Sequence, residues 1–142
     1  MDQSVNPFTN HEVIHSPITI HDCLTWEKTV TQTVPDLASK KCKPCEGGVA
    51  PLKEDEIRTL VKQLEGWEYS DARISKTYAF KDYYQALAFV NATAWISHRE
   101  DHHPDISLGY NRCRVEYTTH AINGLSENDF ICAAKLDKLF DL

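Results

Sequence analysis

The run HREDHHPD, residues 98–105, brings three imidazoles together just before a proline. His102 and His103 are adjacent, His120 follows after seventeen residues, and Asp129 comes nine residues later. An imidazole with its ordinary pKa of ~6.5 can both give and accept a proton near neutral pH. Several histidines with a carboxylate in one cleft are therefore typical of a site that moves protons between atoms of a substrate.

A metal site is the main alternative for these residues. Three histidines and a carboxylate are a plausible ligand set for zinc or iron. His102 and His103 cannot readily bind one ion, because adjacent residues project ~100° apart on a helix and to opposite faces of a strand. His98 and His102 do have the spacing of helical metal sites, so the metal alternative stays open. Any one of these histidines alone is more often structural, and the prediction of catalysis depends on the set.

The hydrophobic pattern predicts three helices and four short strands. The helices are expected over residues 52–67 and 81–100 and after Ser126, and the strands over residues 67–69, 74–80, 105–110 and 112–119. Lys76 shares a face of its strand with Ile74 and Tyr78, which leaves open which face is buried. The order of helix, two strands, helix, two strands, helix predicts an α+β fold. In it, one four-stranded antiparallel sheet carries three helices on one face.

The helix over residues 81–100 has the strongest pattern in the chain. Tyr84, Leu87, Trp95 and His98 recur along it at helical spacings. Tyr84, Phe89 and Trp95 could be taken for a platform that stacks on a flat ring. At helical spacing such aromatic residues more often belong to the core, and we expect them there.

The residues that could do chemistry all fall at the ends of predicted elements. His102 and His103 follow the central helix, which Pro104 limits because the residue before a proline avoids helical backbone angles. His120 follows the last strand, and Asp129 lies in the first turn of the last helix. Side chains at the ends of elements can converge on one cleft, so we predict a shared site.

The composition argues against several classes of protein. The chain has 142 residues, a common size for one domain, and a formal net charge of −6. A nucleic-acid binder would normally carry a basic face. No apolar run approaches the ~20 residues of a membrane-spanning helix, and no signal-peptide pattern is present. We expect a cytoplasmic protein with a loosely ordered extension over residues 1–38 and a folded domain over residues 39–142.

Five cysteines, an odd number, are most simply reduced thiols when no secretory signal is present. Cys113 and Cys132 lie in apolar segments and are expected to be small buried side chains. Cys42 and Cys45 form the motif CKPC, which is half of a zinc site or a redox pair. Because no second such pair exists, we favour an exposed or weakly structural role. A small metal-binding module that uses CKPC with His21 is the rival interpretation.

The run DHHPDISLGYNRCRVEYTTHAINGLSENDFICAAKLD, residues 101–137, closely resembles the pterin-4a-carbinolamine dehydratase family. The family signature has paired histidines followed by a proline, an aromatic residue, a third histidine and an aspartate. The residues in register here are His102, His103, Pro104, Tyr110, His120 and Asp129. The segments YAFKDYYQALAFVNATAWI, LEGWEY and KKCKPCEGG are also similar to members of the family. The resemblance thus covers about residues 40–142.

This resemblance implies a fold and an activity. Members have a four-stranded antiparallel sheet with three helices on one side, and they usually assemble as homodimers or homotetramers. They remove water from 4a-hydroxytetrahydropterin, which aromatic amino-acid hydroxylases leave behind, and give quinonoid dihydropterin without a metal or organic cofactor. Relatives of this fold also act as a dimerisation cofactor for a transcription factor or as assembly factors. A non-catalytic interaction protein is therefore the alternative.

The resemblance also suggests roles for single residues. We expect His102 and His120 to donate a proton to the 4a-hydroxyl group. His103 is expected to contact the pterin ring and take the N5 proton, and Asp129 to orient an imidazole. The residues expected to bind substrate are His98, Asp101, Pro104 and Tyr110. His98 stands where some members carry a glutamate, a departure that leaves the core set intact.

Overall fold

The computed structural model describes residues 36–44 and 50–140. The helices are α1 (Glu54–Val61), α2 (Tyr83–Glu100) and α3 (Glu127–Asp137), and the strands are β1 (Glu68–Ser70), β2 (Arg73–Ala79), β3 (Asp105–Leu108) and β4 (Arg112–Tyr117). Short 3₁₀ turns η1 (Leu37–Ser39), η2 (His120–Ile122) and η3 (Lys138–Phe140) accompany them. The predicted order of helices and strands is confirmed. Most of the extension expected over residues 1–38 lies outside the described residues.

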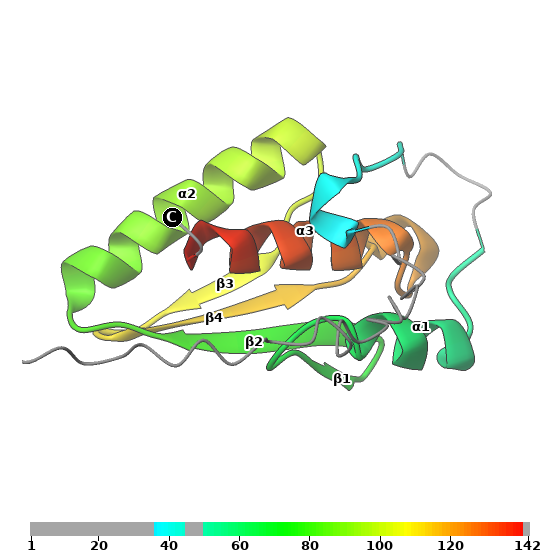
Figure 1. Cartoon of the computed structure of the whole chain (residues 1–142), viewed down its shortest axis with the longest axis horizontal. Helices are drawn as coiled ribbons and strands as arrows, with labels where there is room; N and C mark the ends of the chain where they lie inside the picture. Colours follow the sequence, from blue (N-terminus) through cyan, green and yellow to red (C-terminus); the bar gives the residue numbers. More distant parts are fainter. Residues whose placement is uncertain (1–35, 45–49, 141–142) are drawn as a thin grey trace, which may run out of the picture. The chain divides into compact units, whose positions relative to one another are not determined.

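The four strands form one antiparallel sheet in the order β1-β2-β4-β3. Figure 1 shows α2 and α3 over the same face of this sheet. Alternation along the strands places Ile74 and Tyr78 of β2 on the buried face, together with Cys113, Val115 and Tyr117 of β4. The predicted four-stranded sheet with helices on one face is confirmed.

Helix α3 lies at the centre of the core. Eight of its eleven residues are buried, including Phe130, Ile131 and Leu136. A helix that is buried on most sides must be covered by neighbouring elements, and each large apolar side chain buried in this way stabilises the fold by ~1.5–3 kcal/mol. Ile57 of α1 and Phe89 of α2 belong to the same core cluster. Within residues 36–44 and 50–140, no helix is both long and apolar enough to cross a bilayer.

Helix α2 turns a different face to the core from the one that its aromatic residues suggested. The buried residues of the helix are Ala86, Phe89, Thr93 and Ser97. Tyr84 and Trp95 lie on the opposite side and are 82% and 62% exposed. The expectation of a core position is confirmed for Phe89 and wrong for Tyr84 and Trp95. The buried side thus combines one aromatic residue, Phe89, with the small residues Ala86, Thr93 and Ser97.

Lys76 lies on the buried side of β2, where the carboxylate of Asp137 balances its charge. Its Nζ donates to the Glu65 carbonyl oxygen and to Asp137 Oδ1, each over 2.7 Å. Asp137, the last residue of α3, also accepts hydrogen bonds from the Tyr78 hydroxyl over 2.8 Å and from Trp67 Nε1 over 3.0 Å. A charged residue is tolerated here because the end of α3 supplies its partner.

Candidate active site

Helix α2 ends in a turn directly before the two adjacent histidines. Asp101 has left-handed backbone angles, with φ 51° and ψ 40°. Its N–H donates to the His98 carbonyl, and the His102 N–H donates to the Ser97 carbonyl over 3.1 Å. This pair of bonds is the Schellman pattern that commonly ends helices. The turn directs His102 inward, where it is 7% exposed, while His103 is exposed.

His102 and Asp129 form a buried pair. His102 Nε2 lies 2.7 Å from Asp129 Oδ1, and the Asp129 side chain has no exposed surface. The His102 ring also stacks on Tyr117, with 5.7 Å between ring centroids and 11° between ring planes. Burial raises the pKa of the Tyr117 phenol above its ordinary value. The imidazole is thus held in one orientation by a hydrogen bond and a ring contact.

The second oxygen of Asp129 caps the start of α3. Oδ2 accepts hydrogen bonds from the Ser126 N–H over 2.8 Å and from Thr119 Oγ1 over 2.7 Å. Ser126 is the N-cap residue and Asp129 occupies the third helical position, so the two form a capping box. One carboxylate therefore joins the end of α2, the segment after β4 and the start of α3.

His103 and His120 are exposed, in contrast to His102. His103 directly follows His102, and His120 directly follows Thr119, whose hydroxyl is bonded to Asp129. Because consecutive Cα atoms are only ~3.8 Å apart, both exposed histidines start close to the same buried carboxylate. Among the residues that the structure describes, neither ring has a hydrogen-bond partner. Both imidazoles are therefore free to contact a small molecule.

The residues predicted to bind substrate lie in different places. Asp101 and Pro104 flank the paired histidines, Asp101 in the left-handed turn. His98 is exposed on α2, where its ring centroid lies 6.5 Å from that of Trp95. Tyr110 is 72% exposed at the tip of the β3–β4 hairpin, whose other end carries the connection to α2. The structure does not bring Tyr110 to the His102–Asp129 pair within one chain.

The geometry does not gather a metal ligand set in the described part of the chain. His98 and His102 have helical spacing, but the left-handed residue Asp101 ends the helix between them. Within residues 36–44 and 50–140, no three histidine, cysteine or acidic side chains are grouped as metal ligands would be. The rival module that uses CKPC depends on Cys45 and His21, which lie outside the described residues.

Sequence reasoning identified Asp129 but missed its partner Thr119. Ser126 was expected to be the N-cap, and its position three residues before Asp129 is the spacing of a capping box. No such local signal marks Thr119, because its hydroxyl reaches Asp129 across ten positions of the chain and an intervening turn. Thr119 is 3% exposed, and its hydroxyl also lies 2.8 Å from that of Ser126.

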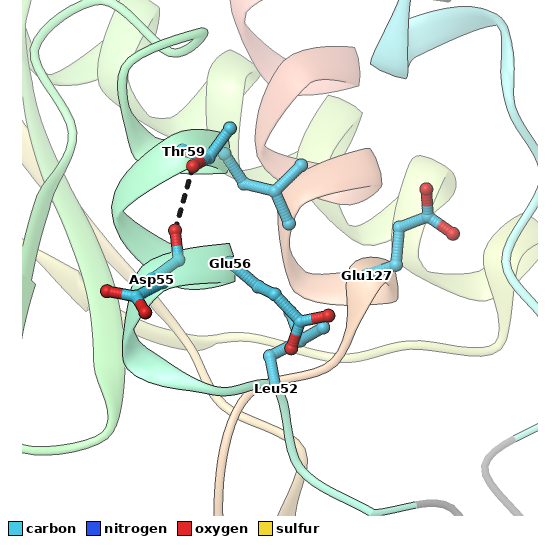
Figure 2. A pocket seen from close by; sticks show the side chains of 6 residues that line it. Leu52, Asp55, Glu56, Thr59 and Glu127 are labelled. Atoms are coloured by element: carbon cyan, nitrogen blue, oxygen red, sulfur yellow. Dashed lines mark hydrogen bonds between the residues drawn. The ribbon is translucent and has the colours of Figure 1, made fainter.

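A groove beside α1 has no histidine in its lining (Figure 2). It is lined by Leu52, Asp55, Glu56, Thr59, Leu60 and Glu127. Its carboxylates make it unsuited to an anionic ligand. No predicted site residue lines this groove, which approaches the site only through Glu127 at the start of α3. We therefore assign the groove no part in the chemistry.

Comparison with known proteins identifies related chains. The family model described as pterin 4 alpha carbinolamine dehydratase matches residues 50–139. A protein of Nitrosospira multiformis is 66% identical over 110 residues, which are 78% of this chain and 97% of that protein. A protein of Nitrosomonas eutropha is 70% identical over 105 residues, which are 73% of this chain and 93% of that protein. Both carry the provisional name pterin-4-alpha-carbinolamine dehydratase.

A solved structure is similar as well. The crystal structure of a transcriptional coactivator/pterin dehydratase from Brucella melitensis has a TM-score of 0.61 and 33% sequence identity. The match covers 63% of this chain and 97% of that one. The matched residues of the family model span all the helices and strands from α1 to α3 and include all the predicted catalytic residues. The chain therefore belongs to the pterin 4 alpha carbinolamine dehydratase family.

Proposed function

We propose that this protein removes water from 4a-hydroxytetrahydropterin and gives quinonoid dihydropterin, by acid–base catalysis with histidines. The observation that carries the proposal is the buried His102–Asp129 pair with two exposed histidines, His103 next to His102 and His120 next to Thr119, which also bonds Asp129. Family membership supports the choice of a pterin as the substrate. An aromatic amino-acid hydroxylase would supply this substrate, because that reaction leaves the hydroxyl group on C4a.

The reaction requires one proton to be given and one to be taken. Hydroxide is a poor leaving group, so the 4a-hydroxyl must be protonated as the bond from C4a to oxygen breaks and water leaves. The N5 proton must go to a base, and the electrons of the N5–H bond then form the double bond between N5 and C4a. We assign the donor to His120 and the acceptor to His103, the two exposed imidazoles.

His102 and Asp129 have a positioning role in this proposal. The sequence suggested His102 as a second proton donor, but its Nε2 is bonded to Asp129 and its side chain is buried. Only Nδ1 remains for a contact with the 4a-hydroxyl group. The pair instead holds the segments that carry His103 and His120 at a constant separation. Fixed geometry of this kind is what makes proton transfer efficient.

Asp101 and Pro104 are the proposed substrate contacts closest to the paired histidines. Asp101 caps α2 with its backbone, which leaves its exposed carboxylate available for the polar edge of a pterin. His98 and Tyr110 lie farther from the buried pair in the single chain. Tyr110 can serve the same substrate only from a second copy of the protein.

We also propose that the protein forms a homodimer or homotetramer through the outer side of α2. Tyr84, Leu87 and Trp95 share this side and are all exposed. A row of large apolar side chains along one helix is typical of a surface that another chain covers. Sedimentation equilibrium should give two or four times the chain mass of 16.2 kDa. Trp95→Glu should shift the mass toward the monomer, and a monomeric wild type would contradict the proposal.

A coupled assay tests the proposed reaction. An aromatic amino-acid hydroxylase generates 4a-hydroxytetrahydropterin, and the absorbance of quinonoid dihydropterin is followed with and without this protein. We expect catalytic amounts of the protein to speed the dehydration at least about tenfold over the spontaneous reaction, since each proton transfer contributes ~10²–10⁴. An unchanged rate would contradict the proposal and favour the non-catalytic interaction protein.

A further inference from the structure

The segment 36–44 is held against α3, and Figure 1 shows its turn η1 beside that helix. The Lys43 N–H donates to Asn128 Oδ1 over 3.0 Å, and Asn128 Nδ2 donates to the Lys43 carbonyl over 2.7 Å. The Cys42 N–H donates to Glu100 Oε2 over 2.9 Å. These contacts fix the backbone at Cys42 and next to it, and with it the direction of the Cys42 Cα–Cβ bond.

Glu100 is a strong anchor for this segment. Partial burial alone would raise its pKa, but the Cys42 N–H and the Lys135 ammonium group together hold the pKa of Glu100 below its ordinary value. The Lys135 Nζ atom lies 2.6 Å from Glu100 Oε1. The carboxylate is thus ionised near neutral pH, and hydrogen bonds to an ionised acceptor are stronger than neutral ones.

The anchored backbone brings two thiols into contact. The Sγ atoms of Cys42 and Cys132 are 3.6 Å apart. A disulfide has its sulfur atoms ~2.0 Å apart, so side-chain rotations that close the gap by about 1.6 Å would join them. Cys132 lies in α3 without exposed surface, whereas Cys42 is partly exposed. The contact with Cys42 and burial raise the pKa of Cys132, so an external oxidant must react first at Cys42.

We propose that Cys42 and Cys132 form a reversible disulfide that ties the segment 36–44 to α3. The oxidant is a low-molecular-weight disulfide such as oxidised glutathione. The Cys42 thiolate attacks one sulfur of this molecule, which gives a mixed disulfide and releases one thiol. Cys132 then loses its proton and attacks the Cys42 sulfur, which closes the internal bond and releases the second thiol. Two protein thiols are oxidised, and one external disulfide is reduced to two thiols.

This pairing differs from the one that the motif CKPC suggests. The motif pairs Cys42 with Cys45, three positions away, and the sequence favoured an exposed or weakly structural role for both. The structure gives Cys42 a partner 90 positions away in the chain. A link between such distant residues restricts the unfolded chain far more than a link within CKPC would. Oxidation of the distant pair should therefore raise the thermal stability of the protein.

Peptide mapping of the full-length protein tests the pairing. The reduced protein is equilibrated with oxidised glutathione, its free thiols are alkylated under denaturing conditions, and it is digested with trypsin without reduction. We expect the peptide 42–53 to be linked to the peptide 115–135. Trypsin does not cleave before Pro44, so Cys42 and Cys45 remain on one peptide. The variant Cys45→Ser therefore shows which of the two is linked to Cys132.

Thermal unfolding of the same samples gives a second readout. Oxidation should raise the Tm of the wild type and of Cys45→Ser by roughly 5–10 °C. It should leave the Tm of Cys42→Ser and of Cys132→Ala unchanged. Each variant is compared with its own reduced form, so any direct effect of the substitution cancels. Linkage of Cys42 to Cys45, or full alkylation of Cys132 after oxidation, would overturn the proposal.

Discussion

Replacement of His120 or His103 by alanine is expected to lower the rate of pterin dehydration by roughly 10²–10⁴ each. The loss follows from removal of the proton donor or the proton acceptor. Both side chains are exposed and have no hydrogen-bond partner among the described residues, so folding should be nearly unaffected, within ~0.5 kcal/mol. The coupled hydroxylase assay measures the rate, and thermal unfolding measures the stability.

A surface variant provides the control for these substitutions. Lys62→Ala changes an exposed residue at the end of α1 and should keep both the wild-type rate and the wild-type stability. His120→Gln keeps a polar side chain of similar size but cannot donate as an acid, so it should be as slow as His120→Ala. Wild-type turnover in both alanine variants, with normal folding, would contradict the histidine mechanism.

The substitution Asp129→Ala is expected to lower the free energy of unfolding by about 3–5 kcal/mol. It removes the acceptor for the Ser126 N–H, for the Thr119 hydroxyl and for the His102 ring at once. All of these groups lie in a buried environment, so water cannot readily replace the carboxylate. Urea unfolding followed by circular dichroism measures the change.

The matched variant Asp129→Asn separates the two roles of this side chain. The amide oxygen can take the place of Oδ2 and keep the cap of α3, while the amide NH₂ group donates to His102 Nε2. Stability should then fall by only about 1 kcal/mol. The His102 ring must change its tautomer, which turns Nδ1, the atom left for a contact with the 4a-hydroxyl group, from a hydrogen-bond acceptor into a donor. The dehydration rate should therefore fall by roughly 10²-fold or more. Equal destabilisation by alanine and asparagine would contradict the assignment of Oδ2 as the cap acceptor.

Much of the fold was predictable because it depends on residues close together in the chain. The apolar spacings predicted all three helices, and the alternation in residues 112–119 agrees with the buried face of β4. The turn between β1 and β2 is a two-residue hairpin in which Asp71 and Ala72 both have positive φ. Turn and helix signals are local, so the order of elements follows from the sequence directly.

The core-facing side of α2 could not be predicted in the same way. Helical spacing shows that Tyr84 and Trp95 share a face, but it does not show whether that face meets the core. In the folded chain the opposite face, with Phe89 and Thr93, is buried. The choice depends on which surface of α2 fits against the sheet and α3, and this is a tertiary contact that helical spacing does not contain.

The sequence by itself determined the residue types of the candidate site and their places at the ends of elements. The tertiary structure alone decided that His102 is buried on Asp129, that Thr119 shares the same carboxylate, and that His103 and His120 are exposed. It likewise decided that Cys42 meets Cys132. Hydrogen bonds and thiol contacts require atoms to meet within about 3–4 Å. Such distances between residues far apart in the chain are set by how α3 packs on the sheet and on α2.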